Sequence, residues 1–127
     1  MRTRRTLLAV MLAMPWSLAI ACGVCIEDKI AVTYDHAVVS QSTARHQVVV
    51  FTAVEGPAAA KALVQKARSA AGRARGVARA SVRAAVDPPA LSFALDPAEQ
   101  SPEAAIGEIE RTAGTPGLRL TLLRVLR

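Results

Sequence analysis

The sequence predicts an α+β fold, in which two helices cover one face of a four-stranded antiparallel sheet. A β-branched run at residues 46–54, a period-two alternation at residues 78–86 and two amphipathic helical patterns point to it. The chain has 127 residues, of which 52% are hydrophobic and only 3% aromatic. Its core must therefore consist of small aliphatic side chains, and a large buried active site is not expected.

The first half of this fold is a strand followed by a helix. The strand ends at a Glu-Gly-Pro break, residues 55–57, and Pro57 suits the first position of a helix. The helix is expected to end between Gly72 and Gly76. Its apolar residues recur at spacings of three and four: Ala60, Leu63, Val64, Ala67 and Ala71.

The second half has a hairpin, a helix and a last strand. Residues 78–86 alternate between apolar and polar side chains, and residues 91–95 return after an Asp-Pro-Pro turn. Ser101-Pro102-Glu103 supplies a capping side chain, a proline and an acid at a helix start. A glycine-containing segment, residues 114–117, ends this helix, and residues 118–126 form the final strand.

The element order βαββαβ is that of the ferredoxin-like fold, expected here over residues 46–127. Right-handed connections place both helices on the same face of the sheet. If Val49, Phe51 and Ala53 face those helices, then Val48, Val50 and Val54 face the open side. Either the segment 26–39 or a second copy of the chain is expected to cover that apolar face.

The first 21 residues have the pattern of a secretory signal peptide. Arg2, Arg4 and Arg5 precede an apolar run, and Ala19-Ile20-Ala21 forms a small-residue cleavage site. We expect a periplasmic or secreted protein after cleavage near Ala21. A lipoprotein anchored at Cys22 is the less favoured alternative, because Ala19 and Ile20 stand in the reverse of the usual order.

The charge and hydropathy of the chain exclude other classes. Removing the three arginines of the signal peptide leaves thirteen basic and ten acidic residues, a net charge of +3. This charge is too small to argue for a nucleic-acid partner, and the arginines of residues 68–83 are expected on a solvated face. No apolar run reaches the roughly 18 residues of a spanning helix, so a membrane-spanning protein is not expected.

Residues 46–126 resemble the heavy-metal-associated domain family, which includes copper chaperones and periplasmic mercury-binding proteins. The resemblance depends on the element order, on Gly76-Val77, on residues 91–97 and on the helix start at residues 101–106. It implies soft-metal binding by a Gly-Met-x-Cys-x-x-Cys loop between the first strand and first helix. The corresponding residues 54–60 contain no cysteine, so the metal ligands of the family do not carry over.

The two cysteines, Cys22 and Cys25, lie instead in an extension, residues 22–45, before the first strand. Ile26, Ile30, Tyr34 and Ala37 predict a helix there, which places the cysteine pair at its N-terminus. The alternation of Ile30, Val32 and Tyr34 permits a strand as the alternative. Two thiolates at this spacing can bind Cu(I), Zn(II) or Hg(II), with His36 or His46 as a further ligand. A thioredoxin-like redox pair and a structural disulfide are the alternatives.

No motif predicts an enzyme. The chain has no glycine-rich phosphate loop and no nucleophile elbow, and the neighbours Asp35 and His36 point apart. We expect a small exported, noncatalytic protein that carries a soft metal ion on Cys22, Cys25 and His36. The alternative is a periplasmic protein-interaction module with a structural disulfide, using an edge strand or forming a homodimer through the open sheet face.

Overall fold

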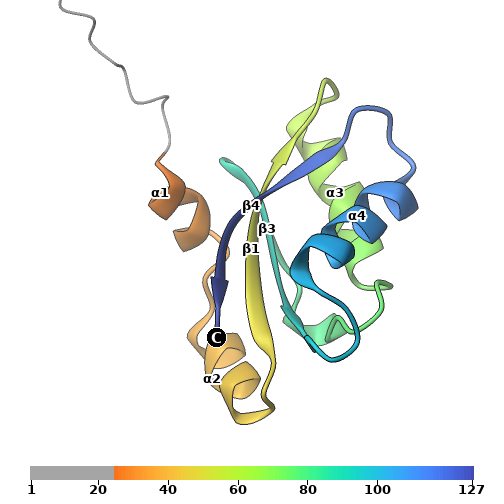
Figure 1. The fold of residues 1–127 in the computed structure, drawn as a ribbon. Coiled ribbons are helices and arrows are strands. Elements are labelled where there is room, and N and C mark those ends of the chain that lie inside the picture. Colours follow the sequence, from red (N-terminus) through yellow and green to blue (C-terminus); the bar gives the residue numbers. More distant parts are fainter. Residues whose placement is uncertain (1–24) are drawn as a thin grey trace, which may run out of the picture.

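The computed structural model describes residues 25–127, so the predicted signal peptide and Cys22 lie outside the described residues. Figure 1 shows three layers: helices α3 and α4 on one side, a four-stranded sheet in the middle, and helices α1 and α2 on the other side. Within residues 25–127, no helix is both long and apolar enough to cross a membrane.

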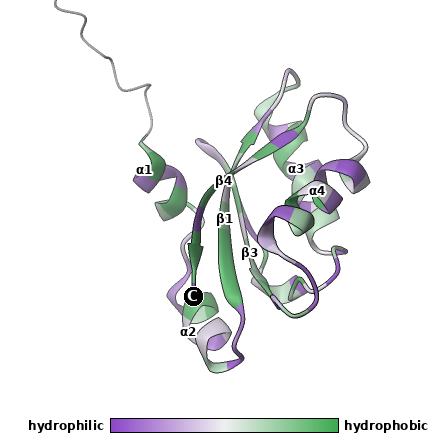
Figure 2. Cartoon of the chain, in the orientation of Figure 1, coloured by the Kyte–Doolittle hydropathy of each residue, from purple (hydrophilic) through white to green (hydrophobic). Residues whose placement is uncertain are grey.

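The sheet has four antiparallel strands, as the sequence predicts. Its strands are β1 (Val48–Glu55), β2 (Arg83–Val86), β3 (Pro89–Leu95) and β4 (Arg119–Leu126). They are arranged in the order β2-β3-β1-β4, and all neighbours are antiparallel. This α+β arrangement is broadly compatible with a ferredoxin-like fold. Strand β1, central in the sheet, is hydrophobic along its length (Figure 2).

Helices α3 (Ala60–Ala71) and α4 (Pro102–Ala113) are the two that the sequence predicts. The Ser101 side chain accepts a hydrogen bond from the backbone N–H of Ala104, and Gly114 ends α4 in the left-handed conformation, as expected. The predicted start of α3 at Pro57 is wrong. The helix begins three residues later, with Ala59 as its N-cap. The Pro57 ring packs on Gly117, where an added Cβ would lie 2.8 Å from Pro57 Cδ.

The predicted second strand is only half correct. Residues 79–81 form a turn of 3₁₀ helix, and strand β2 begins at Arg83. The physical reason is the buried side chain of Ser81, whose Oγ donates to the Ala78 carbonyl and accepts from the backbone N–H of Ala94 at 2.8 Å. The Ser81 hydroxyl accepts the hydrogen bond that a backbone carbonyl of a neighbouring strand would otherwise accept from Ala94. The chain can therefore turn at residues 79–81 without leaving this N–H of β3 unpaired.

The larger core lies between the sheet and the helices α3 and α4. Val48, Val50 and Val54 belong to it, the opposite of the orientation expected for the residues of β1. Every residue of β1 except Glu55 is buried, so the strand has no polar side to reveal which face meets the helices. The other main side chains of this larger core come from α3, α4 and the remaining strands: Leu63, Val64, Leu91, Phe93, Leu95, Ile106 and Ile109.

The extension forms two helices rather than the single one predicted. Helix α1 (Ile26–Ala31) and helix α2 (His36–Ala44) are separated at residues 32–35. The break follows from Asp35, whose carboxylate accepts hydrogen bonds from the backbone N–H groups of Ala37 and Val38. Because Asp35 is an N-cap with extended backbone, a helix cannot run through it.

These two helices cover the sheet face that the sequence leaves open. Ile30 of α1 and Val38 of α2 form a second buried cluster with Val49, Phe51 and Ala94 of the sheet. The segment 26–39 is thus the cover, one of the two alternatives expected. The chain itself occupies the sheet face on which the homodimer expectation depended.

Candidate functional site

Cys25 stands at the N-terminus of helix α1. Its carbonyl accepts the first helical hydrogen bonds, from the backbone N–H groups of Asp28 at 3.0 Å and Lys29 at 3.2 Å. Its side chain is exposed and forms no capping hydrogen bond. The prediction that the motif meets a helix N-terminus is confirmed for Cys25, and its thiol is turned to solvent, where a ligand can reach it.

Helix α1 is held against the sheet by an apolar contact and an ion pair. Ile30 is buried in the second cluster, and the guanidinium of Arg124 donates to both carboxylate oxygens of Glu27, from Nη1 to Oε2 at 3.2 Å. The hydrogen bond from Arg124 lowers the pKa of Glu27. Both oxygens of Glu27 are thus engaged by Arg124, whereas Asp28 in the same turn is exposed.

The link between α1 and α2 is fixed on the middle of the sheet. The hydroxyl of Ser92 donates to the Thr33 carbonyl at 3.1 Å, 59 residues away in sequence. The ring of Tyr34 stacks on Phe51, with centroids 6.4 Å apart and planes 11° apart. Arg83 Nε donates to Asp35 Oδ2 at 3.1 Å and lowers the pKa of that carboxyl. Cys25 is therefore attached to a segment with several fixed points.

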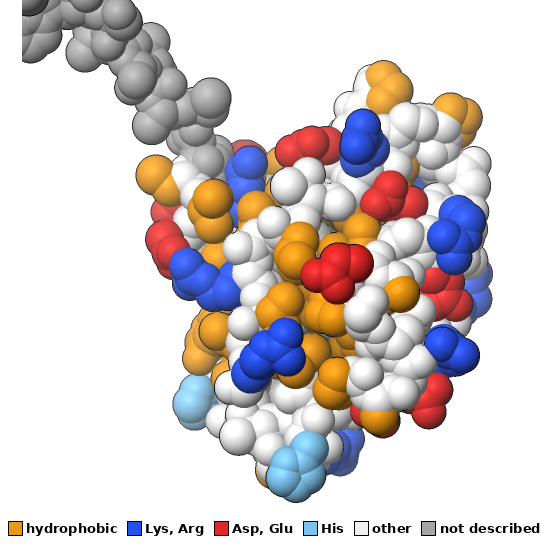
Figure 3. All heavy atoms as spheres, viewed as in Figure 1, with side chains coloured by type: hydrophobic (Ala, Val, Ile, Leu, Met, Phe, Trp, Pro, Cys, Tyr) orange, Lys and Arg blue, Asp and Glu red, His pale blue; other side chains and the backbone are white. Residues whose placement is uncertain are grey.

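His36, predicted as a third metal ligand, is the first residue of α2 and is exposed. Its Nε2 lies 3.4 Å from the hydroxyl of Ser40, one turn along the helix. His46, the alternative ligand, follows α2 and has a left-handed φ of 56°. Figure 3 shows both imidazoles, in pale blue, at the end of the molecule where α2 lies and below α1.

The described residues do not form a complete metal site. Between residues 25 and 127 there is no cluster of three or more His, Cys, Asp or Glu side chains that could hold a metal ion. His36 therefore belongs to no such cluster, and Cys22 lies outside the described residues. The pair Cys22 and Cys25 stays a prediction, with Cys25 placed at an accessible helix end.

The residues that anchor the extension were missed by sequence reasoning. Arg83 was expected on a solvated strand face, but it is half-buried and paired with Asp35. Arg124 lies in the last strand and meets Glu27, 97 residues earlier in the chain. The sequence around a single arginine on a strand does not indicate which carboxylate it will pair with. That carboxylate is brought close only when another segment of the chain packs on the sheet.

Protein-family models, curated proteins and solved structures provide no significant match to this chain.

Proposed function

We propose that this protein binds a soft metal ion such as Cu(I) through Cys22 and Cys25 and carries it outside the cytoplasm. The observation that supports the proposal most directly is the position of Cys25, exposed at the N-terminus of a helix that is itself anchored on the sheet. A fixed, accessible thiol is what a metal-transfer site needs, since the partner must reach the bound ion.

The donor set favours a soft ion with few ligands. Thiolate sulfur prefers Cu(I), Zn(II) and Hg(II) over harder cations, whereas a closed structural zinc site needs four ligands. Cleavage at Ala21 would give Cys22 a free amine, a third donor adjacent to the thiolates. The imidazole of His36, exposed at the start of α2, is the other candidate for the third donor.

The open character of such a site suits a carrier. An ion held by two thiolates at the surface keeps free coordination positions, so a thiol of a partner can enter before a thiol of the carrier leaves. The exposed Ile26, next to Cys25 and 54% accessible, supplies an apolar contact for that partner. No catalytic step is part of the proposal.

The experiment is a competition titration of the reduced protein with Cu(I) under anaerobic conditions, using a chromophoric Cu(I) chelator. We expect one ion per chain, and loss of that binding in the double variant Cys22→Ser/Cys25→Ser. His36→Asn and His46→Asn are the matched controls and should retain most of the affinity. Equal affinity in the wild type and the double-serine variant would overturn the proposal.

A second candidate function is that of a protein-interaction module. The long edge strand of the sheet favours it. Strand β4 is an edge strand of eight residues, and its Leu122 is 37% accessible. An edge of this length can pair with a strand of another chain. Sedimentation of wild type and Leu122→Lys tests self-association through this edge. A monomer at all concentrations would rule out pairing between copies.

A further inference from the structure

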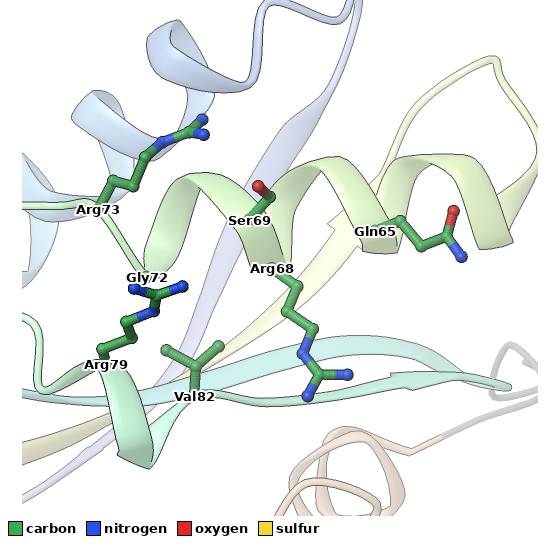
Figure 4. A pocket seen from close by; sticks show the side chains of 7 residues that line it. All are labelled: Gln65, Arg68, Ser69, Gly72, Arg73, Arg79 and Val82. Carbon is green, nitrogen blue, oxygen red and sulfur yellow. The ribbon is translucent and has the colours of Figure 1, made fainter.

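A pocket of about 480 Å³ lies between helix α3 and the 3₁₀ turn at residues 79–81, on the opposite side of the sheet from α1. Its size is within the range of roughly 300–1,000 Å³ common for small-molecule sites. Three arginines line it, Arg68, Arg73 and Arg79, and Figure 4 shows these side chains with the others of the lining. The remaining lining residues are Gln65, Ser69, Gly72 and Val82.

No carboxylate of the chain neutralises these arginines. All ten acidic residues lie within the described range 25–127, because residues 1–24 contain no Asp or Glu. The ion pairs among the described residues are Asp35 with Arg83 and Glu27 with Arg124, neither of which involves the pocket. Glu108, on α4, accepts from the backbone N–H of Arg75 and from the Gln100 side chain, not from a pocket arginine.

The backbone carbonyls at the C-terminal end of α3 accept hydrogen bonds from the backbone rather than from the arginine side chains. The carbonyls of Arg68, Ala70 and Ala71 accept hydrogen bonds from backbone N–H groups of residues 72–74. The partial negative charge at a helix C-terminus is about half an elementary charge. Three guanidinium charges exceed this several-fold, so the pocket is strongly positive.

One of the arginines packs on the backbone of α3, and one buried apolar residue lies in the lining. The stem of Arg79 packs on Gly72, where a Cβ would lie 3.6 Å from Arg79 Cγ. Val82 is buried, and in Figure 4 it lies between Arg68 and Arg79, whereas Arg73 extends to the other side of Gly72. Ser69, beside Arg68 on α3, adds a hydroxyl donor to the lining.

We propose that this pocket binds a small oxyanion of the phosphate or pyrophosphate type, with Arg68 and Arg79 as its main ligands. The planar guanidinium group donates two parallel hydrogen bonds to two oxygens of such an anion, and these charge-assisted bonds are stronger than neutral ones. The Ser69 hydroxyl and the Gln65 amide supply neutral donors at the same surface. The site is separate from the cysteine motif and does not depend on metal binding.

The test is a titration of the purified protein with inorganic phosphate and with pyrophosphate, at an ionic strength held constant with sodium chloride. NMR follows the arginine Nε–H signals and the backbone amides of Ser69 and Gly72. We expect saturable shifts at these positions. The variants Arg68→Gln and Arg79→Gln should each weaken binding by at least about tenfold.

Arg45→Gln is the matched control, because Arg45 is an exposed arginine at the end of α2, on the other face of the sheet. It should bind both anions as the wild type does. Thermal unfolding shows that each variant is folded. Unsaturated shifts spread over all arginines, or unchanged affinity in both pocket variants, would overturn the proposal.

Discussion

The carboxylate of Asp35 joins two parts of the fold with its two oxygens. Oδ1 accepts from the backbone N–H of Ala37 at 2.9 Å and so caps helix α2, while Oδ2 accepts from Arg83 Nε at 3.1 Å. Arg83 begins β2, so this side chain both starts a helix and attaches it to the sheet. Loss of Asp35 should therefore affect the docking of the extension as well as the local helix.

Replacing Asp35 by alanine removes the cap and the ion pair together. We expect the melting temperature to fall by about 4–8 °C, the size typical of a lost N-cap in a domain of this length. Asp28→Ala is the matched control, since Asp28 is an exposed aspartate in the first turn of α1. Differential scanning calorimetry measures both variants. An equal, small shift in the two would show that Asp35 does not hold the extension.

Acid should weaken the fold through Asp35 and Glu27. Hydrogen bonds from Arg83 and Arg124 lower the pKa of these carboxyls below their ordinary values of 3.8 and 4.5. Since the folded pKa is the lower one, their contribution to stability is complete above about pH 5 and is lost as pH falls through the folded values.

The double variant Asp35→Asn/Glu27→Gln should consequently lose less stability than the wild type between pH 5 and pH 3. Asparagine still caps a helix, so the comparison isolates the charge. Urea unfolding at a series of pH values provides the free energies. Parallel curves for the two proteins would contradict this assignment of the ion pairs.

Two isoleucines of the same short helix should respond very differently to truncation. Ile30 is 6% accessible and Ile26 is 54% accessible. Ile30→Ala should lower the free energy of unfolding by about 2–4 kcal/mol, because it leaves a cavity over Val49 and Phe51. Ile26→Ala should change it by less than about 0.5 kcal/mol. A small effect at both positions in urea unfolding would mean that α1 adds nothing to the cooperative fold.

Two glycines should respond to alanine with opposite signs. Gly76 has a φ of +81°, and a Cβ there would lie 2.7 Å from Glu99 Cβ, so Gly76→Ala should destabilise the fold by about 1–3 kcal/mol. Gly107 is inside helix α4, where a Cβ meets only the flexible end of Arg111. Gly107→Ala should stabilise the fold by about 0.5–1 kcal/mol. Destabilisation by both in chemical denaturation would disprove the expected difference.

The cysteine motif should be dispensable for folding. Cys25 is exposed and makes no capping hydrogen bond, and a loop closed over two intervening residues constrains the unfolded chain little. We expect the Cys22→Ser/Cys25→Ser variant to melt within about 2 °C of the wild type. Circular dichroism checks this. A loss of cooperative unfolding would show that the motif belongs to the core.

The elements with strong local signals are the ones that sequence reasoning predicted well. The Ser101 cap, the Gly114 end of α4 and the β-branched run of β1 are each determined by neighbouring residues, and the structure contains them. The break at Asp35 was missed because an apolar spacing that continues through Tyr34 suggests one helix. Tyr34 instead reaches Phe51 from the segment between two helices.

The orientation of β1 and the attachment of the extension depended on distant segments. With apolar residues on both sides of the strand, alternation could not tell which face met α3. The pairs of Arg83 with Asp35 and Arg124 with Glu27 join residues 48 and 97 positions apart, and no local pattern marks them. For the candidate site, the sequence indicated Cys25 at a helix end, but it did not indicate what holds that helix.

The docking of α1 also orders events during folding. Its contacts are with β1, β3 and β4, and Glu27 needs Arg124, so the helix that is synthesised first has its full binding surface only after β4 has paired. A six-residue helix is unstable alone in water. Closing such long loops costs entropy before any contact compensates for it. The segment that begins at Cys25 can therefore complete its docking only after β4, the last strand, has been synthesised and paired.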